Sequence, residues 1–162
     1  MLKLFDEIGV PDPIQGYFGS PTGLGPLTLK DHYLSIEALA LGIAAPADLI
    51  TVWDRARNTL LYSWFSYDLN SVAPLQAFVA LELGLRMRLG DRAKGSPGMQ
   101  GLLEKAVSDG IVIDPYKRPP TLAAMAGKMR NHWGHGTPNV ADPNLAVQTF
   151  EFCKGLISAL YP

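Results

Sequence analysis

Apolar side chains recur every three or four residues along most of the chain, the spacing that places them on one face of an α-helix. The pattern is most regular over residues 72–92, where Phe78, Leu81 and Leu85 belong to a wide apolar face. On this basis six helices are predicted, over about 28–42, 46–69, 72–92, 97–109, 121–134 and from about 142 to the C-terminus.

Residues that favour helix ends stand where these patterns begin. Thr28 and Asp31 have the spacing of a weak capping box, in which each side chain bonds to the other residue's backbone. Thr121 opens the fifth predicted helix, and Asp142 or Asn144 can cap the last one.

The first 27 residues carry no helical pattern. Four prolines and five glycines interrupt any helix or long strand there, so an irregular N-terminal arm is predicted. Its aromatic residues Phe5, Tyr17 and Phe18 are expected to hold the arm against the body of the protein.

The order of predicted elements favours one all-α domain over residues 1–162. Alternating strand–helix units and a glycine-rich phosphate loop after a strand are both absent, which excludes the α/β nucleotide-binding folds. We therefore predict an antiparallel helical bundle with four to five core helices, built on three long antiparallel helices.

Composition limits the possible partners and compartments. The net charge is −1, so the chain lacks the overall basic field of strong non-specific nucleic-acid binders, and any such contact must be local. The single cysteine, Cys153, excludes an intramolecular disulfide and fits a cytoplasmic setting. Acidic residues and Pro11 come too early for a signal peptide, and no long uncharged apolar run predicts a membrane helix.

The densest group of reactive side chains stands near the end of the fifth predicted helix. Arg130, Asn131, His132 and His135 lie within six consecutive residues, and the chain has only three histidines. Asn131 and His135 share a face if the helix persists, whereas Arg130 and His135 lie about 140° apart around a regular helix. They converge only if the last turn loosens at Gly134 or if another chain completes the site.

These residue types suit the cleavage of a phosphodiester bond. Histidine takes or gives a proton near neutral pH, and arginine clamps a phosphate and stabilises charge that develops on it. A ribose 2′-hydroxyl can serve as the nucleophile, so neither a protein nucleophile nor a metal is needed. Asn131 could orient the histidine or the phosphate.

Two other interpretations of these residues stay open. His132 and His135 have an acceptable spacing for metal ligands, with Asp142 or Glu82 as a third ligand. Alternatively, the stretch is a helix terminus whose basic groups interact with the helix dipole. Further expectations are a core or interface position for Trp133, a surface ion pair between Glu82 and Arg86, a buried unreactive Cys153 and a surface position for His32.

The stretch Arg130–His135 (RNHWGH), followed by Gly136, resembles the signature of the HEPN superfamily: an arginine, often followed by a polar residue, then a histidine after four to six residues. Two further stretches are similar to segments found upstream in that superfamily: residues 80–86 (ALELGLR) and 102–111 (LLEKAVSDGI). Their order also agrees. The resemblance covers residues 45–160 and leaves out residues 1–44.

The resemblance implies a helical bundle that dimerises, with the two Arg/His motifs meeting at the interface. Catalytic members are metal-independent endoribonucleases of toxin–antitoxin, defence and RNA-processing systems, and need no cofactor. Arg130 would then stabilise the phosphorane, His135 would transfer the proton and Asn131 would assist. A second copy also answers the angular problem, because His135 of one chain could act beside Arg130 of the other.

The resemblance further implies RNA as a partner, with an antitoxin or another protein as a possible additional one. The residues expected to contact the substrate are His132, Lys128, Arg86, Glu82, Lys117 and Arg118. Phe150, Phe152 and Trp133 are candidates for the dimer interface. Other HEPN members are non-catalytic dimers that bind a protein, a nucleotide or RNA, and this remains the alternative prediction.

Overall fold

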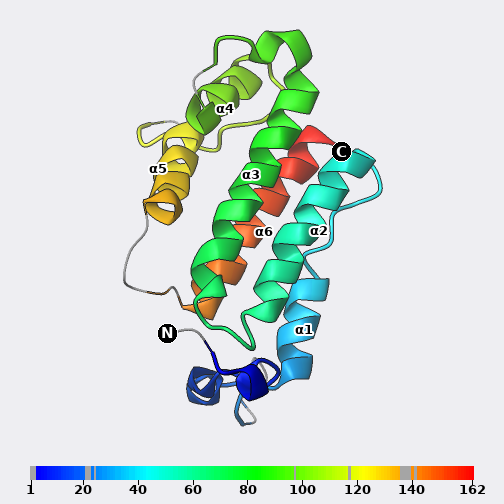
Figure 1. The fold of residues 1–162 in the computed structure, drawn as a ribbon. Helices are drawn as coiled ribbons and strands as arrows, with labels where there is room; N and C mark the ends of the chain where they lie inside the picture. The colour runs from blue at the N-terminus through cyan, green and yellow to red at the C-terminus, as the bar shows by residue number, and fades with distance from the viewer. Residues whose placement is uncertain are drawn as a thin grey trace.

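The computed structural model describes residues 3–20, 23, 25–96, 98–116, 118–135, 140 and 142–162 of the chain (Figure 1). Its α-helices are α1 (Leu29–Glu37), α2 (Ala47–Tyr62), α3 (Leu69–Leu89), α4 (Gly98–Ser108), α5 (Leu122–Gly134) and α6 (Pro143–Leu160). Short 3₁₀ helices are η1 (Phe5–Glu7), η2 (Pro13–Tyr17) and η3 (Gly90–Ala93). Within these residues, β pairing is limited to one isolated bridge, which confirms the all-α class.

Three helices, α1, α5 and α6, begin at caps that the sequence predicts. Thr28 Oγ1 accepts the Asp31 amide at 3.1 Å, and Asp31 accepts the Thr28 amide at 3.1 Å, which completes the capping box of α1. Thr121 caps α5, and Asp142 caps α6 by accepting the Asn144 amide at 2.7 Å. Each cap satisfies a backbone N–H that has no partner inside its own helix.

Helix α3 forms the centre of the bundle. Helices α2 and α6 pack on it along its length, and the α4–α5 pair packs against it as well (Figure 1). Leu49 of α2 and Leu160 of α6 both lie against Gly84 of α3; a Cβ atom on Gly84 would lie 3.1 Å from Leu49 Cδ2. The glycine therefore allows a close approach of neighbouring helices near the middle of the core.

The prediction of three antiparallel long helices is wrong in one respect. Helix α2 runs opposite to α3, but α6 runs in the same direction as α3 (Figure 1). The rings of Phe78 and Phe152 lie 6.4 Å apart, and the Tyr161 hydroxyl donates to the Gly84 carbonyl at 2.9 Å. Residue numbers therefore increase in the same direction along α3 and α6. Helices α3 and α6 therefore begin at the same end of the bundle (Figure 1).

The turn between α2 and α3 also differs from the prediction. Helix α2 ends at Tyr62 and α3 begins at Leu69, whereas the apolar pattern predicted helix to residue 69 and a new start at residue 72. Trp64 lies in the turn but is buried. The turn therefore continues the apolar spacing of α2 although its backbone is not helical. No helix in the described part of the chain is long and apolar enough to cross a membrane.

The N-terminal arm is fixed to the body mainly by hydrogen bonds. The Asp12 amide donates to the Trp64 carbonyl at 2.9 Å, and Gln15 Nε2 donates to the Ser63 carbonyl at 3.0 Å. Phe18 stacks on Tyr67 at 6.0 Å, as the sequence predicts for one aromatic residue of the arm. For the other two the prediction is wrong, since both Phe5 and Tyr17 are 86% exposed.

Candidate functional site

The end of α5 is fixed in the core by one aromatic side chain. Trp133 is buried, as the sequence predicts, and packs with the core cluster. Its burial fixes the rotation of the last turn, so Arg130, Asn131 and His132 stay at the surface. His135 follows the helix as its C-cap residue, and its amide donates to the Asn131 carbonyl at 3.1 Å.

A hollow of about 400 Å³ lies where α5 meets α3 and the start of α4. The described residues that line it are Glu82, Gly98, Met99, Gln100, Gly127, Arg130 and Asn131. Three residues of the predicted site, Glu82, Arg130 and Asn131, therefore come together from helices far apart in the sequence. The hollow is open to solvent and can admit part of a large ligand.

Two glycines of α5 shape the surroundings of Arg130. A Cβ atom on Gly134 would lie 3.2 Å from Arg130 Nη1, so the guanidinium rests against the glycine one turn further along the helix. A Cβ atom on Gly127 would lie 3.2 Å from Gln100 Oε1, so this glycine makes room for α4. Both contacts depend on the missing side chain, because a methyl group would force its neighbour to move.

The predicted pair Glu82–Arg86 forms. Arg86 donates from Nη2 and Nε to Glu82 Oε1, at 2.7 and 3.2 Å. The side chains are 27% and 48% exposed, so the pair contributes only about 0.3–0.5 kcal/mol to stability, as exposed pairs on helices do. Its greater importance is electrostatic, because it places a carboxylate beside the hollow that Arg130 lines.

The other predicted site residues that the structure describes do not line the hollow. His135 is exposed but is not among the described lining residues. His132 is exposed and meets the edge of Trp133 with ring centroids 5.4 Å apart. Lys128 and Arg118 are exposed as well, whereas Lys117 and Gly136 fall outside the residues that the structure describes. One chain thus brings Arg130 next to Asn131 and leaves His135 facing solvent.

Two candidates for a dimer interface are wrong. Phe150 is fully buried and meets Trp53 at 5.2 Å inside the bundle, and Trp133 is buried in the same core. Phe152 packs against this core and is partly exposed. The apolar spacing of α6 did not separate inner from outer positions, because apolar residues also stand at exposed or partly exposed positions of this helix, such as Leu145 and Phe152.

Among the residues that the structure describes, no group of three or more His, Cys, Asp or Glu side chains could hold a metal ion. Cys153 is buried, as the sequence predicts, and its burial raises the pKa of the thiol well above its usual range. Such a thiol stays protonated at neutral pH and is a poor nucleophile.

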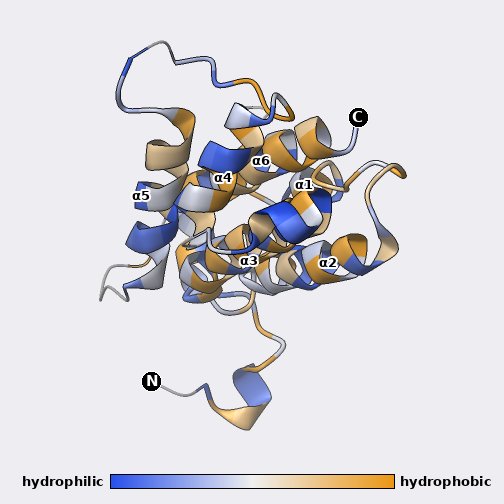
Figure 2. Ribbon diagram, turned by 90° about the horizontal axis from the view of Figure 1, so that it is seen from above, coloured by the Kyte–Doolittle hydropathy of each residue, from blue (hydrophilic) through white to orange (hydrophobic). Residues whose placement is uncertain are grey.

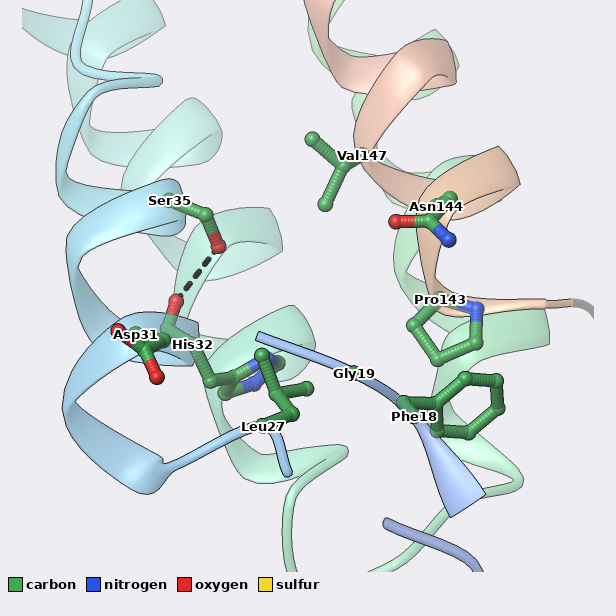
Figure 3. Close-up of a pocket in the computed structure, with 9 residues that line it drawn as sticks. All are labelled: Phe18, Gly19, Leu27, Asp31, His32, Ser35, Pro143, Asn144 and Val147. Carbon is green, nitrogen blue, oxygen red and sulfur yellow. Dashed lines mark hydrogen bonds between the residues drawn. The ribbon is translucent and has the colours of Figure 1, made fainter. Parts of the chain in front are cut away.

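A second hollow, of about 420 Å³, lies between the N-terminal arm, α1 and the start of α6 (Figure 3). Residues of the arm, of α1 and of the start of α6 line it, including Phe18, Asp31, His32, Asn144 and Val147. His32 was expected at the surface, and this expectation is wrong, since only 4% of the residue is exposed. Its burial comes from long-range contacts with the end of α2 and with the arm, which no local pattern predicts.

The surroundings of His32 define its protonation state. Nε2 lies 3.1 Å from the Leu60 carbonyl and 3.2 Å from the Leu61 carbonyl. Because both partners are acceptors, Nε2 must carry a hydrogen atom. Burial lowers the pKa of His32 below its ordinary value of 6.5, and the two carbonyls oppose this shift only in part.

This histidine should make the folded protein sensitive to mild acid. The unfolded chain takes up a proton near pH 6.5, and the folded chain does so only at lower pH because the pKa of His32 is lowered. The free energy of unfolding should therefore fall as the pH drops below about 6.5. Urea denaturation at about pH 7.5 and about pH 5.5 measures the loss, and His32→Gln should show a smaller one. An equal pH dependence in both proteins would contradict the assignment.

Comparisons of the chain with models of protein families, with characterised proteins and with solved structures found no match.

Proposed function

We propose that this protein is a metal-independent endoribonuclease of the HEPN type that acts as a homodimer in the cytoplasm, in a toxin–antitoxin or defence system. The observation that carries the proposal is the hollow between α3, α4 and α5, which is lined by Arg130, Asn131 and Glu82. Glu82 also forms an ion pair with Arg86. These are residues of two separate stretches that resemble the superfamily.

The position of His135 supports a site built from two chains. It lies past the end of α5, is exposed, and does not line the hollow that holds Arg130 of its own chain. In a two-fold dimer, His135 of one chain could enter the hollow of the other, and the same contact would repeat by symmetry. Each dimer would then hold two equivalent sites.

The proposed reaction uses the RNA's own hydroxyl group. A base, His135, removes the proton from a ribose 2′-hydroxyl, whose oxygen then attacks the adjacent phosphorus atom. The bond from phosphorus to the 5′-oxygen breaks, and the leaving oxygen takes a proton. The products are a 2′,3′-cyclic phosphate and a 5′-hydroxyl end. Arg130 stabilises the charge on the phosphoryl oxygens, and Asn131 orients the phosphate or the histidine.

The direct test is the cleavage of a labelled single-stranded RNA by the purified protein in the presence of EDTA. We expect cleavage to continue and to leave 2′,3′-cyclic phosphate ends. The matched control is DNA of the same sequence, which lacks the nucleophilic hydroxyl and should remain intact. Raising the salt concentration should weaken binding, because basic side chains would contact the backbone phosphates. Equal cleavage of the DNA, or cleavage that EDTA abolishes, would sink the proposal.

A second candidate function is a non-catalytic dimer that binds a protein partner, such as an antitoxin. The observation in its favour is Glu82, whose carboxylate lies beside the hollow and opposes the approach of a phosphate. A hollow with both charge signs suits the mixed polar surface of a protein. This candidate predicts no RNA cleavage by the purified protein, and partner binding that survives His135→Ala.

A further inference from the structure

The first part of the N-terminal arm exposes apolar side chains that its own chain leaves uncovered. In residues 3–10, Phe5 is 86% exposed, Leu4 70% and Ile8 59%. Figure 2 shows this segment standing away from the helices. Exposed apolar residues are common one at a time, but several in one short projecting segment mark a contact surface.

The projecting segment has an internal structure. The Leu4 amide donates to Glu7 Oε2 at 3.3 Å, and Lys3 Nζ donates to the Val10 carbonyl at 2.9 Å. At its base, the Asp12 amide is bonded to the Trp64 carbonyl. A segment that is already folded and fixed at one end loses less conformational entropy when it binds.

An apolar groove lies on the body between α1 and the end of α2. Its volume is about 620 Å³, and it is lined by Leu29, Lys30, Tyr33, Leu61, Tyr62 and Phe65. Tyr62 is 59% exposed, and its ring lies 6.3 Å from that of Phe65. The groove thus offers aromatic and aliphatic side chains with one basic group.

We propose that this groove binds the projecting segment, residues 3–10, of a second copy of this chain. The exposed apolar side chains of the segment match the apolar lining of the groove, and its Asp6 and Glu7 are complementary in charge to Lys30. Phe65 follows Trp64, the residue that fixes the base of the arm, so the arm's base and the groove are neighbours. A two-fold axis there lets two chains exchange arms reciprocally.

This contact is separate from the proposed ribonuclease site. Helix α5 packs on α3 and α4, whereas the groove belongs to α1 and α2 on the other side of α3 (Figure 1). The total mass of the assembly would therefore not identify which contact has formed. A test must report on the arm and the groove themselves.

Disulfide cross-linking between two single variants provides this test. We expect Phe5→Cys protein mixed with Tyr62→Cys protein to form a disulfide-linked heterodimer under mild oxidation. The native thiol of Cys153 is buried and should not compete. The matched control replaces Tyr62→Cys with Ile43→Cys, whose position is fully exposed but lies outside the groove. The groove variant should give several-fold more heterodimer than this control.

Charge reversal adds a second readout. Lys30→Glu in the groove partner should lower the yield of heterodimer, and Asp6→Lys in the arm partner should restore it. Equal yields with the groove and control variants would overturn the proposal. So would a Phe5→Cys/Tyr62→Cys double variant that closes its disulfide within one monomer, because the arm would then fill its own groove.

Discussion

Replacing either Arg130 or His135 by alanine should lower the rate of RNA cleavage by about 10²- to 10⁴-fold. These are the losses typical for removal of a general base or of a group that stabilises transition-state charge. Both side chains are exposed, so the variants should keep the wild-type thermal stability. Arg55→Ala is the matched control, because it removes an exposed arginine of α2 that lies outside the hollow and should leave the activity unchanged.

A mixture of the two inactive proteins distinguishes a site shared between chains from a site within one chain. If Arg130 of one chain works with His135 of the other, a mixed dimer holds one intact site and one that lacks both residues. Equal amounts with free exchange should restore about one quarter of the wild-type rate, since half of the dimers are mixed and half of their sites are intact. No recovery after exchange would contradict a site shared between two chains. The activities of the single variants would still show whether Arg130 and His135 are needed for cleavage.

Trp53→Ala should reduce the free energy of unfolding by about 3–5 kcal/mol, a large part of the stability of a domain of this size. The indole is fully buried, donates from Nε1 to the Leu39 carbonyl at 2.8 Å, and meets Phe150 edge-on. The substitution leaves a cavity and a buried carbonyl without its donor. Urea denaturation at low temperature measures the effect.

Two further variants identify the source of this loss. Trp53→Phe keeps most of the apolar contact but removes the donor, so its loss should lie between those of wild type and Trp53→Ala. Val79→Ala removes an exposed apolar side chain on the neighbouring helix and should change stability by less than about 0.5 kcal/mol. A Trp53→Ala protein as stable as Val79→Ala would show that Trp53 does not hold α2, α6 and the end of α1 together.

Local sequence was sufficient for the presence of the six helices and for the starts of α1, α5 and α6. Caps such as Thr28, Thr121 and Asp142 act within three residues, so a linear pattern contains the whole interaction. The end of α2 was misplaced because Trp64 keeps an apolar spacing in a turn. The parallel course of α3 and α6 could not be predicted, since it depends on the path of more than 50 residues between them.

In the candidate site, too, local sequence predicts the positions of some residues, and the packing of helices determines the others. Arg130 and Asn131 are neighbours on one helix, so their joint position at the hollow follows from the sequence. The arrival of Glu82 and of Gln100 depends on how α3 and α4 pack, which the local spacing of residues does not contain. The angular separation of Arg130 and His135 was expected, and the structure leaves His135 outside the hollow.

The packing of α4 and α5 has a consequence for how the hollow persists in solution. These two helices contact mainly each other and α3, whereas most of the largest fully buried side chains belong to α2, α3 and α6. Such a peripheral pair can detach in a local unfolding event that costs less than global unfolding. Glu82 would remain on the core while Arg130 leaves with α5, so the free energy that docks this pair sets the lifetime of the assembled hollow.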